Sequence, residues 1–83
     1  MKFIAEIDVM PHKELLDPQG KTVAKNMKHI HIEGVEDVRI GKHIRLVVEA
    51  ADETGAREIV EAASRKVLIN PIMEGFAFTL HKI

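Results

Sequence analysis

The sequence predicts one α+β domain, residues 1–83, in which an antiparallel sheet and two helices form two layers in the ferredoxin-like order β-α-β-β-α-β. Strict alternation of apolar and polar residues at both ends and in the middle of the chain predicts the strands. Two stretches with helical apolar spacing, each behind an aspartate, predict the helices. With the helices on one face, the other face of the sheet is expected to serve oligomerisation.

The first strand is predicted from the start of the chain. One set of alternating positions is apolar: Phe3, Ala5, Ile7 and Val9. Of the residues that alternate with them, Lys2, Glu6 and Asp8 are polar and Ile4 is apolar. Pro11 ends the run because proline has no backbone N–H to donate. This pattern is typical of a strand with one buried face.

The first helix is expected to begin at Asp17-Pro18, since aspartate suits the N-cap and proline the first helical position. Val23, Met27 and Ile30 then recur at helical spacing, and Gly34 interrupts the pattern. This predicts a helix of three to four turns.

Residues 35–50, "VEDVRIGKHIRLVVEA", alternate on both sides of a glycine. We expect two strands joined at Gly41-Lys42, and one long strand with a glycine bulge is the alternative.

The second helix is predicted from Asp52 to Asn70-Pro71, with a single apolar stripe: Ala56, Ile59, Val60, Ala63 and Val67. Residues 74–83, "EGFAFTLHKI", complete the sheet as a last strand. The motif D-x-x-G occurs twice, at Asp17 and at Asp52, which is weak evidence that the two halves of the chain are an internal repeat.

Two β-branched residues, Ile4 and Val47, point away from the predicted core. Exposed apolar residues on an open sheet favour a partner, so we predict that both lie on the face used for dimer formation. Isolated surface residues are the alternative interpretation.

The composition excludes several classes of function. The 12 Lys and Arg residues balance 13 Asp and Glu residues, which argues against nucleic acid and anionic membranes as partners. The chain has no cysteine, so thiolate catalysis and zinc-thiolate sites are excluded. The start of the chain carries Glu6 and Asp8 where a signal peptide would be apolar, and we expect a cytoplasmic protein.

Candidate catalytic and metal-binding groups do not combine into a site. The five histidines lack metal-ligand spacing: His12, His29, His31, His43 and His81. No hydroxyl stands in the context of an activated nucleophile, and the glycines at the helix starts match no phosphate-binding fingerprint. We expect no catalytic residue, metal or cofactor in this chain.

Three motifs carry a resemblance to a known family. Leu16-Asp17-Pro18-Gln19-Gly20, Val38-Arg39-Ile40-Gly41-Lys42 and Asn70-Pro71 occur in the order and approximate spacing of the PurS subunit of phosphoribosylformylglycinamidine (FGAM) synthase. The chain resembles that family from the first strand to the last.

The resemblance implies a subunit of a glutamine- and ATP-dependent ligase of purine biosynthesis. It implies PurL synthetase and PurQ glutaminase as partners, a homodimer or tetramer, and ATP and Mg in PurL rather than in this chain. It also implies a non-catalytic role, in which the chain joins the two enzymes and supports ammonia transfer between them.

Gly20 is costly in the first turn of a helix, since glycine is about 1 kcal/mol worse than alanine there. We predict that another backbone approaches it, and that subunit contact involves five residues: Asp17, Gln19, Gly20, Arg39 and Lys42. Relief of crowding within the chain is the alternative. A second functional interpretation is a small ligand-binding regulatory domain with a metabolite at a dimer interface near Gly20 or Gly41.

Overall fold

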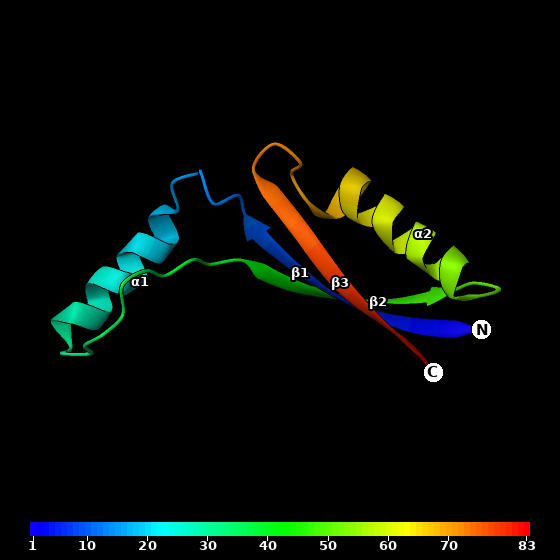
Figure 1. Cartoon of the computed structure of the whole chain (residues 1–83), viewed down its shortest axis with the longest axis horizontal. Coiled ribbons are helices and arrows are strands. Elements are labelled where there is room, and N and C mark those ends of the chain that lie inside the picture. Colours follow the sequence, from blue (N-terminus) through cyan, green and yellow to red (C-terminus); the bar gives the residue numbers. More distant parts are fainter.

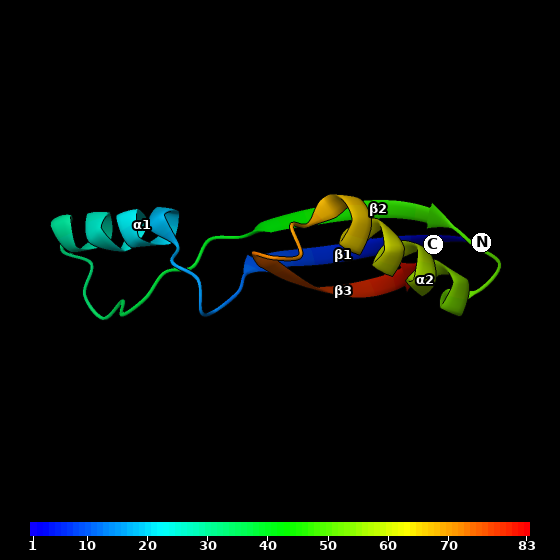
Figure 2. The same ribbon diagram turned by 90° about the horizontal axis from the view of Figure 1, so that it is seen from above.

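The computed structural model describes all 83 residues. The elements are β1 (Lys2–Pro11), α1 (Pro18–His29), β2 (Lys42–Glu49), α2 (Glu53–Ala63), a π-helical turn (Ser64–Leu68) and β3 (Glu74–Lys82). The strands form one antiparallel sheet in the order β2-β1-β3 (Figures 1 and 2). The α+β class and the antiparallel sheet are confirmed. None of the helices combines the length and apolar character that a bilayer crossing requires.

The sheet has three strands, so the predicted fourth strand is wrong. Lys42 pairs with Val9 at the end of the β1–β2 ladder, and β1 itself ends at Pro11. Residues 35–39 therefore extend beyond the central strand, and Ile40 and Gly41 lie beside its last two residues without joining the ladder. The alternation before Gly41 reflects an extended segment whose polar groups bond elsewhere.

The core lies between the sheet and α2. Four alternate residues of β1 are buried: Phe3, Ala5, Ile7 and Val9. The last three form one cluster with Val60 of α2. The neighbouring strands add half-buried residues on the same face: Ile44, Leu46, Val48, Phe76, Phe78 and Leu80. The period-2 prediction is confirmed on all three strands.

The predicted stripe on the second helix is only partly correct. Ala56 and Val60 are buried, while Ile59 is 43% and Val67 79% exposed. The helix widens into a π turn at Ser64, where the Ile69 N–H donates to the Ser64 carbonyl at 3.0 Å. This wider turn changes the phase of the residues that follow, so Val67 leaves the buried face.

The sheet and α2 form the two predicted layers, but the prediction that both helices belong to the helical layer is wrong. α2 covers the sheet, whereas α1 projects beyond its end and has no packed interface with the sheet or α2 (Figures 1 and 2). We call α1 the arm. Its apolar residues Val23 and Met27 are only half-buried, and Ile30 is exposed.

The projecting arm makes the chain unusually extended. Its extents are 51 × 27 × 14 Å and its radius of gyration is 16.4 Å, against about 12 Å for a compact domain of this length. The accessible surface is 6162 Å², whereas a compact monomer of this mass exposes about 5,000 Å².

Candidate functional site

The arm joins the sheet through a region that we call the elbow, residues 12–20 together with residues 38–41. Its centre is Asp17, which is 8% exposed and caps the arm. The Gly20 N–H donates to one carboxylate oxygen at 3.0 Å, and the Ile40 N–H donates to the other at 2.8 Å. These bonds, the first foremost, hold the pKa of Asp17 below its ordinary value. One carboxylate thus ties together two segments that are distant in the sequence.

Arg39 makes the second connection within the elbow. Its guanidinium donates from Nη1 to the Leu15 carbonyl at 2.9 Å and from Nη2 to the His12 carbonyl at 2.7 Å. Both are charge-assisted bonds to backbone that is in neither helix nor sheet. Arg39 therefore fixes the course of the chain between β1 and the arm.

Two glycines let backbones meet in the elbow. A Cβ on Gly20 would collide with the Val38 carbonyl oxygen, and a Cβ on Gly41 would collide with the Val9 carbonyl oxygen. The backbone that approaches Gly20 belongs to this chain, so the structure supports the alternative interpretation, relief of crowding within the chain. The space beside both glycines is filled by carbonyl groups, which argues against a metabolite bound there.

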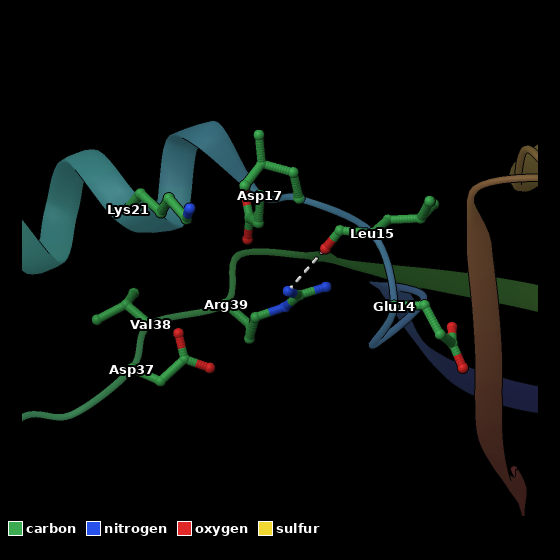
Figure 3. A pocket seen from close by; sticks show the side chains of 8 residues that line it. Glu14, Leu15, Asp17, Lys21, Asp37, Val38 and Arg39 are labelled. Carbon is green, nitrogen blue, oxygen red and sulfur yellow. Dashed lines mark hydrogen bonds between the residues drawn. The ribbon is translucent and has the colours of Figure 1, made fainter.

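A depression of about 260 Å³ lies between the arm and residues 37–39 (Figure 3). Its lining mixes both signs of charge: Glu14, Leu15, Leu16, Asp17, Lys21, Asp37, Val38 and Arg39. In Figure 3 the Arg39 side chain points across it to the Leu15 carbonyl. Because the guanidinium is engaged with the backbone and three carboxylates stand around it, the depression is a poor anion site.

A second hollow, of about 520 Å³, brings together two of the three sequence motifs. Residues of the first motif line it with the turn after the π-helical segment: Pro11, Leu16, Asp17, Pro18, Gln19, Asn70, Met73 and Glu74. Asn70 shapes this turn by accepting from the Ile72 N–H at 3.1 Å. Leu16 and Met73 are more than half exposed. This side of the elbow offers apolar surface to a partner.

The five predicted contact residues therefore fall into two groups. Asp17, Gly20 and Arg39 meet in the elbow and hold the chain together. Gln19 is exposed on the rim of the larger hollow, and Lys42 stands at the start of β2, where its Nζ lies 3.7 Å from a Glu74 oxygen. Contact with another subunit stays a prediction for all five.

The face of the sheet opposite α2, which we call the open face, has no covering layer (Figure 1). Ile4 and Val47 are cross-strand partners on it, and Val47 is 63% exposed. Their predicted orientation is confirmed, while their use in dimer formation stays a prediction.

Beside this pair lies a charge cluster that the sequence did not reveal. The His43 ring bonds Asp8 through Nδ1 at 2.7 Å and Glu6 through Nε2, and Arg45 donates to Glu6 at 2.6 Å. The bonds to Asp8 and then Glu6 raise the pKa of His43, and His43 and then Arg45 lower the pKa of Glu6. A carboxylate on each ring nitrogen requires the doubly protonated imidazole. Only the strand register could have predicted this grouping.

The chain is similar in sequence to proteins of one known family. The family model PurS, described as phosphoribosylformylglycinamidine (FGAM) synthase, matches residues 4–82. The chain belongs to the PurS family. Two relatives bear the name phosphoribosylformylglycinamidine synthase subunit PurS. The one from Synechocystis is 35% identical over 94% of this chain and 78% of its own length. The one from Thermotoga maritima is 36% identical over 89% of this chain and 90% of its own length.

Solved structures of PurS proteins share the whole fold. A chain in the structure of PurLQS from Thermotoga maritima superposes with a TM-score of 0.90 at 32% identity, covering 96% of this chain and 98% of that one. Bacillus subtilis PurS gives a TM-score of 0.87 at 28% identity, covering 96% of this chain and 99% of that one. The three-stranded sheet with its projecting arm is therefore the architecture of this family.

Proposed function

We propose that this chain is the non-catalytic PurS subunit of a glutamine- and ATP-dependent FGAM synthase, a ligase of purine biosynthesis. The supporting observation is the family match over residues 4–82, together with a PurS-like chain in the PurLQS structure. In this role it bridges a PurQ glutaminase and a PurL synthetase and supports ammonia transfer between them. ATP and Mg bind to the synthetase, and the complex works in the cytoplasm.

The shape of the chain supports a bridging role. Its surface exceeds that of a compact monomer of the same mass by about 1,200 Å², more than the roughly 800 Å² that one partner buries in a standard interface. The arm has an apolar stripe, Val23, Met27 and Ile30, that the chain itself covers only in part. The elbow holds the arm outward by directional bonds, so partners can contact it without first ordering it.

Reconstitution tests this function. The chain is mixed with PurL and PurQ from the same source, and ATP-dependent amidine formation is measured with glutamine and separately with ammonia. We expect the glutamine reaction to require the chain and the ammonia reaction to proceed without it. Turnover of glutamine or ATP by the chain alone would contradict a non-catalytic role.

Gln19 gives the cleanest test of subunit contact at the elbow, because it is exposed and makes no side-chain hydrogen bond within the chain. Gln19→Ala is expected to weaken binding to the other subunits while the melting temperature stays unchanged. Thr54→Ala, an uncharged change at the equivalent exposed position of α2, is the matched control and should leave binding unchanged. Equal binding of both variants would remove this side of the elbow from the interface.

Self-association through the open face is tested by a charge at its centre. Val47→Lys is expected to shift the chain from oligomer to monomer in sedimentation velocity, since a buried, unpaired ammonium is costly in an interface. Val67→Lys changes a valine that is also mostly exposed but lies on the α2 side of the sheet, and it should leave the oligomer intact. An oligomer that survives Val47→Lys would place the contact elsewhere.

A further inference from the structure

One edge of the sheet is open to an additional strand. β3 is the outer strand in the order β2-β1-β3, and the nine residues Glu74–Lys82 pair only with β1 on their inner side (Figure 2). We call the outer side the β3 edge. An outer strand carries a row of backbone N–H and C=O groups that can pair with another chain.

The register identifies the backbone groups that point outward. At one end of the ladder the Ile83 N–H donates to the Lys2 carbonyl at 2.9 Å, and just past the other end the His12 N–H donates to the Met73 carbonyl at 2.9 Å. Inward and outward bonding alternate along an antiparallel strand. The odd-numbered residues from 73 to 83 therefore bond to β1, and Phe76, Phe78 and Leu80 present their N–H and C=O groups to the β3 edge.

The middle of this edge lacks the features that usually prevent pairing. Residues 75–80, "GFAFTL", contain no charge and no proline, whereas the opposite edge strand, β2, carries Lys42, His43, Arg45 and Glu49. Natural sheets protect outer strands with charges, proline or bulges. β3 carries Glu74 at one end and His81 and Lys82 at the other, so only its six middle residues lack this protection.

Two arginines from α2 and its extension flank the β3 edge. The Arg57 guanidinium carbon lies 5.7 Å from the centre of the Phe78 ring, and that of Arg65 lies 5.4 Å from the centre of the Phe76 ring. Both side chains are more than half exposed. Each engages a glutamate one turn earlier through a single nitrogen, so several N–H donors per guanidinium stay free.

We propose that the β3 edge binds an extended segment of a partner subunit that carries carboxylates at alternate positions. The backbone of the segment pairs with Phe76, Phe78 and Leu80, and its carboxylates meet Arg57 and Arg65 on the α2 side. A second copy of β3 fits this edge less well, because its one carboxylate, Glu74, already accepts from the Asn70 N–H at 2.9 Å and lies 3.7 Å from the Lys42 Nζ. The inference rests on the proposed function, which supplies PurL and PurQ as the partners.

The test is residue-resolved amide hydrogen exchange on the full chain, alone and after addition of PurL, PurQ or both from the same source. We expect the amides of Phe76, Phe78 and Leu80 to gain at least tenfold protection in the complex. Ala77 and Thr79 already bond to β1 and serve as internal controls, with a much smaller change. Protection of the three outward amides that depends on the concentration of the chain alone would assign the edge to a second copy and overturn the proposal.

The charge component is tested with Arg57→Gln combined with Arg65→Gln. This pair is expected to weaken binding to the partner subunit at least tenfold, and Arg45→Gln, which removes an exposed arginine of the open face, is the matched control. Circular dichroism checks that both variants keep the native fold. Unchanged binding by the double variant would overturn recognition of carboxylates.

The outcomes separate this proposal from the proposed function. Glutamine-dependent synthesis without protection at the β3 edge leaves the subunit role intact and overturns docking at this edge. Protection without any requirement for the chain in synthesis supports docking and contradicts the coupling role. Failure to bind either subunit overturns both.

Discussion

The two motifs D-x-x-G give a paired prediction with opposite signs. Asp17 and Asp52 each cap a helix by accepting from the glycine N–H three residues later, so Gly20 and Gly55 occupy equivalent helical positions. In a helix, Gly→Ala is stabilising by up to about 1 kcal/mol where the added methyl group has room. Only the surroundings of the Cβ distinguish the two sites.

At Gly20 the methyl group meets the Val38 carbonyl oxygen, and it also comes within 2.7 Å of the Asp17 carboxylate. Val38 cannot move easily, because Arg39 and Ile40 beside it are bonded into the elbow. Because the methyl group would overlap a backbone oxygen, the cost lies in the upper part of the range of about 1–3 kcal/mol that is typical of overpacking, and it exceeds the gain in helix propensity. We expect a net loss of about 1–2 kcal/mol, or a melting temperature lower by roughly 4–16 °C for a domain of this size.

At Gly55 the methyl group meets only an Asp52 side-chain oxygen at 3.3 Å and the Ala50 Cβ at 3.6 Å. Gly55→Ala should therefore raise the melting temperature by a few degrees. Both variants are compared with the parent chain by circular dichroism at one fixed concentration, since self-association also stabilises. If Gly20→Ala stabilises the chain as Gly55→Ala does, the proposed packing of the elbow is incorrect.

Three further predictions concern single side chains. Arg39→Lys should lower the free energy of unfolding by about 1–2 kcal/mol in urea titrations, because an ammonium cannot bond both carbonyls in the geometry of the planar fork; an unchanged midpoint would contradict this role. The folded pKa of Asp17 is lowered, so its stabilisation is complete above the unfolded pKa near 4 and is lost as pH falls through the folded value; Asp17→Asn should be less stable at pH 7 and show a weaker loss of stability below pH 5. The folded pKa of His43 is raised, so its stabilisation is present below the unfolded value of about 6.5 and is lost as pH rises through the folded one; His43→Gln should remove that loss above about pH 6.5 in thermal melts, and an identical pH profile would exclude the ionic bonds.

The sequence predicted the elements that depend on local signals. Alternation ended by Pro11 located β1, and the capping signal at Asp17-Pro18 located the start of α1. The fourth strand was wrong because alternation shows that a segment is extended but not whether a strand lies beside it. The position of Gly41 past the end of the β1–β2 ladder depends on register, which no local pattern contains.

The candidate site was also predicted only where local signals were sufficient. The motifs pointed to Asp17, Gly20 and Arg39, which do lie together, but their partners within the chain are backbone groups that any residue could have supplied. The cluster around His43 arises from cross-strand neighbours whose numbers differ by more than 30. Long-range pairing, rather than residue type, decided these contacts.

Because the elbow holds the arm at one end only, a small rotation there produces a larger displacement at the other end. Twelve helical residues at about 1.5 Å per residue give an arm of roughly 18 Å, so a rotation of 10° at the elbow displaces its tip by about 3 Å. A displacement of that size is comparable to a hydrogen-bond length and would misalign an entire row of contacts at the tip. The accuracy with which the far end of this chain meets its surroundings is therefore set by one carboxylate, one guanidinium and a glycine at the near end.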